Sequence, residues 1–82
     1  MNSTQSVCAP DLFVLLERAY RSRARSCAAC VFTLPFRIAS RPGMPNWSVI
    51  PSAECSETCR GTLEELVAKF QQTYRLADPR MA

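Results

Sequence analysis

The chain has 82 residues, of which 48% are hydrophobic and 21% are charged, and its formal net charge is +3 at pH 7. This length allows one small domain, and the composition is that of a globular protein, which excludes a largely disordered chain. The mild positive charge does not by itself indicate a protein that binds nucleic acid. Because so small a core is only marginally stable, we expect an additional staple: a metal ion, disulfides or a second copy in a homo-oligomer.

Residues 1–9 are polar and predict a flexible N-terminal tail, and Pro10 with Asp11 then suits the first turn of a helix. Apolar residues follow at helical spacing, which predicts a helix that ends between residues 22 and 26. Its apolar stripe consists of Leu12, Leu15, Leu16, Ala19 and Tyr20.

Residues 31–38 predict a strand, because apolar side chains alternate onto one face. These side chains are Phe32, Leu34, Phe36 and Ile38. Pro35 lacks an amide donor, so the strand should lie at a sheet edge or contain a bulge. Pro42 and Gly43 fit the centre of a type II turn, and residues 46–50 predict a second strand. Together these segments predict a β-hairpin.

Residues 56–76 predict the clearest helix of the chain, with an apolar face that Cys55 and Cys59 extend backwards. The helix could begin near Cys55, capped by Ser52 or Ser56, or at Thr62, where a Thr-x-x-Glu capping box starts. Gly61 favours the later start, since a glycine inside a helix costs about 1 kcal/mol relative to alanine.

The predicted fold is a single small α+β domain over residues 10–78, in which an N-terminal helix, a β-hairpin and a C-terminal helix follow one another, with residues 79–82 as a C-terminal tail. Both helices should cover one face of the hairpin. The predicted core consists of Leu12, Leu15, Leu16, Phe32, Leu34, Leu63, Leu66, Val67, Phe70 and Tyr74.

Cysteines occur as a Cys-x-x-Cys pair at Cys27 and Cys30 and a Cys-x-x-x-Cys pair at Cys55 and Cys59. The predicted packing places both pairs at the bases of the helices, where they can converge. Four thiolates are a common ligand set for a tetrahedral structural Zn²⁺, and its binding would add folding free energy that a small chain lacks. We therefore predict a zinc-finger-like metal site made of these four cysteines.

Three other interpretations of the cysteines stay open. Disulfides from Cys27 and Cys30 to Cys55 and Cys59 would staple the helices across the hairpin, and four cysteines allow three connectivities. Free thiols can pack as small apolar groups in a core. A thiol redox site is disfavoured, because a thioredoxin-like motif follows a strand and precedes a helix, the reverse of the order here.

The expected compartment decides between these interpretations. Residues 1–10 lack the features of a secretory signal, and no apolar run is long enough to span a bilayer, so no membrane association is expected. We therefore expect a reducing cytoplasm, where paired cysteines favour metal binding or redox chemistry over structural disulfides.

The chain contains no histidine, which removes the commonest general base, and we expect no enzymatic activity. The leading hypothesis is a non-catalytic interaction or adaptor module that binds a protein partner, with Trp47 as either a core anchor or an exposed hot spot. The alternative is a small accessory or regulatory protein that binds nucleic acid, or an acidic partner, through Arg18, Arg21, Arg25 and Arg41. A second alternative is a thiol redox protein.

Overall fold

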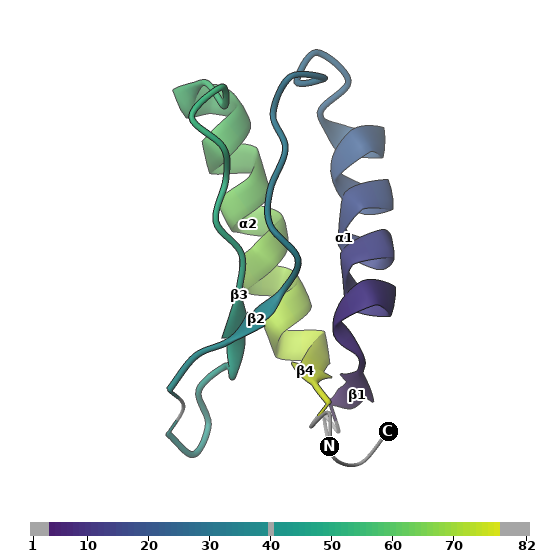
Figure 1. Ribbon diagram of the computed structural model, residues 1–82, viewed down its shortest axis with the longest axis vertical. Coiled ribbons are helices and arrows are strands. Elements are labelled where there is room, and N and C mark those ends of the chain that lie inside the picture. Colours follow the sequence, from purple (N-terminus) through teal and green to yellow (C-terminus); the bar gives the residue numbers. More distant parts are fainter. Residues whose placement is uncertain (1–3, 40, 78–82) are drawn as a thin grey trace.

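The computed structural model describes residues 4–39 and 41–77. Its elements in chain order are β1 (Gln5–Val7), α1 (Ala9–Arg23), β2 (Phe36–Arg37), β3 (Trp47–Ser48), α2 (Glu57–Thr73) and β4 (Tyr74–Leu76). The helices run side by side in opposite directions, and the segments that carry β2 and β3 run lengthwise in front of α2 (Figure 1). The predicted α+β order of helix, hairpin and helix is confirmed.

Helix α1 starts where the sequence predicts, with proline in its first turn and Asp11 near the positive end of the helix dipole. Leu12, Leu16 and Tyr20 recur every four residues and are completely buried, so they form the core-facing stripe. Leu15 was expected in the core but is exposed, because the buried stripe is narrower than the predicted one.

Helix α2 begins at the earlier of its two predicted starts. The Ser56 hydroxyl accepts a hydrogen bond from the Cys59 amide at 3.2 Å and caps the helix at Glu57. The Thr62 start is wrong: Thr62 lies inside the helix, where its hydroxyl donates to the Thr58 carbonyl. The core-facing side chains of α2 are Leu63, Leu66 and Val67.

The hairpin contains the bulge that Pro35 predicts. Phe36 pairs with Ser48, whereas Phe32 bridges to Pro51, so four residue steps on one strand face three on the other. The extra residue reverses the alternation of side chains after Phe32. Leu34 is therefore 53% exposed and Phe36 37% exposed, and the predicted core position of Leu34 is wrong.

A second, parallel sheet joins the two ends of the described chain. Gln5–Val7, which the sequence analysis assigned to the tail of residues 1–9, forms β1 and pairs with β4. The other side of β4 is occupied by side chains of the hairpin: Asn46 bonds both the amide and the carbonyl of Leu76, and the Trp47 indole donates to the Tyr74 carbonyl. The predicted tail of residues 79–82 lies outside the described residues.

Candidate functional site

Two disulfides join the cysteine pairs. Cys27 is bonded to Cys59, with 5.8 Å between their Cα atoms, and Cys30 is bonded to Cys55, with 4.4 Å between theirs. The four cysteines converge as predicted, but the zinc site is wrong, because each sulfur is consumed in a disulfide and no thiolate is left to ligate a metal. Within residues 4–39 and 41–77, no cluster of three or more cysteine, aspartate or glutamate side chains is placed to hold a metal ion.

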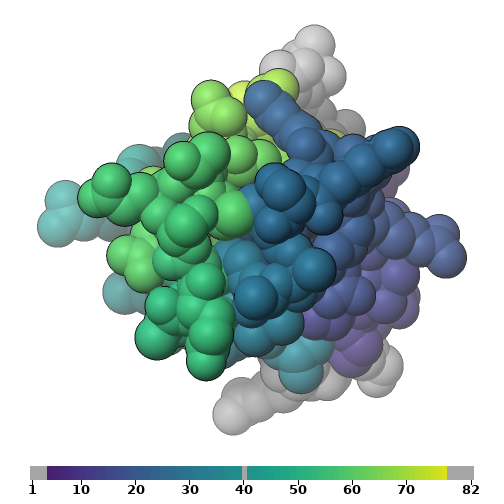
Figure 2. All heavy atoms as spheres, turned by 90° about the horizontal axis from the view of Figure 1, so that it is seen from above, coloured from purple at the N-terminus to yellow at the C-terminus, as the bar shows by residue number. Residues whose placement is uncertain are grey.

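The disulfides hold the end of α1 against the start of α2. Seen from this end of the molecule, the turn after α1 packs directly on the first turns of α2 (Figure 2). Hydrogen bonds support the same junction: Arg21 Nη1 donates to the Cys27 carbonyl at 2.9 Å, and the Tyr20 hydroxyl donates to the Cys59 carbonyl at 3.1 Å. The arrangement is that of a structural staple.

The pairing does not favour thiol redox chemistry. Cys27 and Cys30 are bonded to the other cysteine pair and not to each other, and both are buried. A redox-active disulfide needs a sulfur that an attacking thiolate can reach. Cys8, outside both bridges, is a free and exposed thiol.

The disulfides also correct the expected compartment. Disulfides form and persist in oxidising surroundings, such as those of extracellular or secreted proteins, and are rare in a reducing cytoplasm. The predicted cytoplasmic location is therefore wrong, and two disulfides point to an oxidising environment.

No protein-family model, curated protein or solved structure matches the chain. The site must therefore be interpreted from its own residues. None of the helices in the described parts of the chain has the length and apolar character needed to cross a bilayer.

The four predicted arginine contacts do not form one surface. Arg18 and Arg25 are exposed, whereas Arg21 is half-buried, lies 4.0 Å from the Glu17 carboxylate and covers the Tyr20 ring. Arg41 belongs to the loop between β2 and β3, at the opposite end of the molecule from the turn that carries Arg25 (Figure 1).

Trp47 is the core anchor of the hairpin and not an exposed hot spot. Its side chain is completely buried, and its indole N–H donates to the Tyr74 carbonyl at 3.0 Å. A buried indole with a satisfied donor contributes packing and orientation, so contacts with a partner have to come from other side chains.

The outward side of the hairpin carries exposed apolar side chains, and we call this surface the hairpin face. Its members and exposed fractions are Val31 (52%), Leu34 (53%), Phe36 (37%) and Ile50 (57%). From the sequence, Leu34 was predicted in the core and Phe36 on the same face of the strand, so this surface was not predicted. Pro35 was the available signal, because the bulge that it predicted turns both side chains outward.

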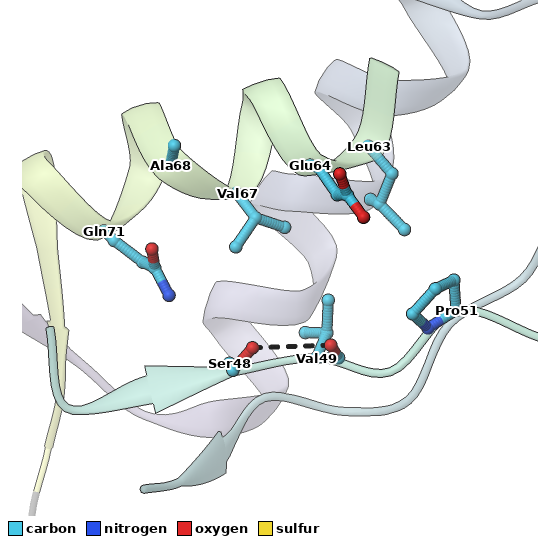
Figure 3. Close-up of a pocket in the computed structure, with 8 residues that line it drawn as sticks. All are labelled: Ser48, Val49, Pro51, Leu63, Glu64, Val67, Ala68 and Gln71. Carbon is cyan, nitrogen blue, oxygen red and sulfur yellow. Dashed lines mark hydrogen bonds between the residues drawn. The ribbon is translucent and has the colours of Figure 1, made fainter. Parts of the chain in front are cut away.

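A groove of about 250 Å³ lies between the segment of residues 48–51 and α2. Leu63 and Val67 of α2 face Val49 and Pro51 across it, and Glu64 extends from α2 beside them (Figure 3). Further along α2, the Gln71 side chain donates to the Trp47 carbonyl at 2.7 Å and closes that end of the groove. No sequence pattern predicts this groove, because it depends on the distance between the hairpin and α2.

Proposed function

We propose that the protein is a non-catalytic interaction module, stabilised by its two disulfides, that binds a protein partner through the hairpin face. The observation that carries the proposal is the exposure of Val31, Leu34, Phe36 and Ile50 on the two paired segments of the hairpin. Large apolar side chains grouped on a surface are typical of sites where another protein docks, and aromatic residues are enriched there. The absence of histidine from the whole chain supports a non-catalytic role.

The hairpin face is held in place by the groups beneath and beside it. Cys30, next to Val31, is bonded to Cys55, and the Val31 carbonyl accepts a hydrogen bond from the Ser52 amide at 2.8 Å. On the inner side, Phe32 packs edge-on against Tyr20 with 5.9 Å between ring centroids. A surface that is already ordered loses little conformational entropy on binding, which favours affinity.

The test is a comparison of partner capture by three forms of the oxidised protein. The double variant Leu34→Ser/Ile50→Ser makes the hairpin face polar, and Val14→Ser removes an apolar side chain of similar exposure from α1. We expect cross-linked partners from the source cells to be recovered with the wild type and Val14→Ser, and to be lost with the double variant. Recovery of the same proteins with all three forms would show that the hairpin face is not the binding surface.

Nucleic-acid binding is the second candidate, because Arg18 and Arg25 are exposed. Within the described residues, neither arginine forms an ion pair. Phosphate binding weakens steeply as salt rises, by release of counterions. Anisotropy of labelled single-stranded and double-stranded oligonucleotides should then rise at low salt in the wild type and not in Arg18→Gln/Arg25→Gln. No change at low salt would reject this candidate.

A further inference from the structure

Val49 presents an unpaired backbone edge to α2. The carbonyls of Asn46 and Ile50 accept bonds from the opposite hairpin strand, whereas the Trp47 carbonyl points the other way and accepts from Gln71 of α2. Val49, two residues after Trp47, therefore also directs its backbone groups toward the groove. Its amide N–H has no partner among the described residues, and its carbonyl accepts only a long bond of 3.4 Å from the Ser48 hydroxyl.

This edge is open over a short length only. On one side of Val49, Gln71 already occupies the Trp47 carbonyl, and on the other side Pro51 has no amide N–H. Such blocks are typical of natural sheet edges that are protected against uncontrolled strand pairing. Between these blocks, Val49 is the one residue whose N–H and C=O can both pair with an added strand. The edge can therefore bind a short extended segment but not a long one.

The walls of the groove define the side chains that such a segment would carry. Leu63 and Val67 on one side and Val49 on the other provide a buried apolar lining. Glu64 is the only charged side chain that lines the groove, and within the described parts of the chain its carboxylate forms no ion pair. From Glu64 to Gln71 the helix rises ~10 Å, which is the length of about three residues of an extended chain.

We propose that this groove binds a short extended peptide segment of a partner protein, which pairs with the Val49 backbone and places an arginine side chain against Glu64. Arginine fits better than lysine, because its planar guanidinium can bond a carboxylate through two N–H groups at once. The site is separate from the hairpin face, since the segment adds at the strand edge and the hairpin face lies on the outward side of the strands.

The test is selection of a displayed library of random pentapeptides on the purified, oxidised protein. We expect enrichment of peptides that contain arginine beside apolar residues. An enriched peptide, titrated into labelled protein, should shift the NMR signals of Val49 and Ala68 more than those of Val31 and Leu34. In Glu64→Gln its affinity should fall roughly three- to ten-fold, the loss of one charge-assisted contact.

Glu54→Gln is the matched control, because it removes an equally negative, exposed side chain that does not line the groove, and it should keep wild-type affinity. Selection on Glu64→Lys should enrich acidic peptides in place of basic ones. No enrichment, enrichment without basic residues, or equal affinity for wild type and Glu64→Gln would overturn the proposal. Signals that shift only on the hairpin face would also overturn it, while leaving the proposed function of that face intact.

Discussion

The Asn46 side chain forms hydrogen bonds with β4 in the way that the backbone of a neighbouring strand would. Its side-chain amide donates to the Leu76 carbonyl and accepts from the Leu76 amide, both at 3.0 Å, in the two-bond pattern that a neighbouring strand would make. The side chain is only 5% exposed, so water cannot replace these bonds easily. Buried backbone groups that lose their partners cost free energy, which makes this residue a sensitive point of the fold.

We predict that Asn46→Ala lowers the free energy of unfolding by about 2–4 kcal/mol, because it leaves the Leu76 amide and carbonyl buried without partners. Denaturant titration followed by the fluorescence of Trp47, the only tryptophan of the chain, measures the change. Gln72→Ala is the control, since this exposed side chain of α2 should change stability by less than ~0.5 kcal/mol. Equal stability of both variants would contradict the role assigned to Asn46.

Tyr20 should make the protein sensitive to alkaline pH. Burial raises the pKa of its hydroxyl above the ordinary value of 10.0, and the positive charge of Arg21 opposes part of that rise. The folded protein therefore holds the proton more tightly than the unfolded chain does. Its contribution to stability is complete below the unfolded pKa and is lost as pH rises through the raised pKa of the folded state.

We predict that wild-type stability falls above pH ~10 and that Tyr20→Phe shows a smaller fall over the same range. At neutral pH, Tyr20→Phe should lose about 1 kcal/mol, because the hydrogen bond to the Cys59 carbonyl is removed. Denaturant titrations at several pH values measure both effects. Tyr74→Phe is the control that removes the only other tyrosine hydroxyl of the chain. An identical alkaline loss in Tyr20→Phe would refute the assignment to Tyr20.

At the scale of elements, the helices could be predicted and the side-chain pattern of the hairpin could not. Helix α2 has a long apolar face and a serine cap, which are both local signals. The strand of residues 31–38 also has a local pattern, but a bulge reverses it, and the location of the extra residue depends on pairing with the distant segment of residues 48–51. Because the bulge adds one residue to this strand, Leu34 lies on the surface and not in the predicted core.

The two glycines of the chain should respond to alanine with opposite signs. Gly61 lies inside α2, and an added Cβ would meet no atom within 4 Å, so Gly61→Ala should raise stability by about 0.5–1 kcal/mol. Gly43 has a φ of +83°, where an L side chain is strained, so Gly43→Ala should lower stability by about 1 kcal/mol. Thermal unfolding followed by circular dichroism measures both. A loss of stability in Gly61→Ala would mean that this part of α2 is not a regular helix.

On the scale of the whole molecule, the two helices are tied together at both ends. The disulfides join the end of α1 to the start of α2, and the parallel pairing of β1 with β4 joins the opposite ends. The sequence could indicate that the cysteines converge, because their pairs flank the predicted hairpin. The sequence could not decide between a zinc site and disulfides, because four cysteines that lie close together can form either one. The expected reducing compartment favoured zinc, which is wrong. The β1–β4 pairing was also missed, because three residues form too short a pattern to recognise.

The disulfide assignment predicts how many thiols react. The chain has five cysteines, four of which are bonded and one of which, Cys8, is free. Denatured but unreduced protein should therefore gain one alkyl group from iodoacetamide by intact mass, and reduced protein should gain five. Cys8→Ser is the control and should gain none before reduction. Five alkyl groups without reductant would mean that the cysteines are free thiols.

The same disulfides should supply much of the stability of the fold. Each closes a loop with cysteines 32 or 25 residues apart, and restriction of the unfolded chain by such a loop contributes about 3–4 kcal/mol. We predict that Cys30→Ser/Cys55→Ser stays folded with its free energy of unfolding reduced by about 3 kcal/mol, because the other bridge still joins the helices.

Removal of both bridges should unfold most of the protein at ~37 °C, since a small domain has a total free energy of unfolding of only about 5–15 kcal/mol. Trp47 fluorescence and circular dichroism, with and without reductant, measure this loss. A reduced chain that melts like the oxidised protein would show that the core alone holds the fold.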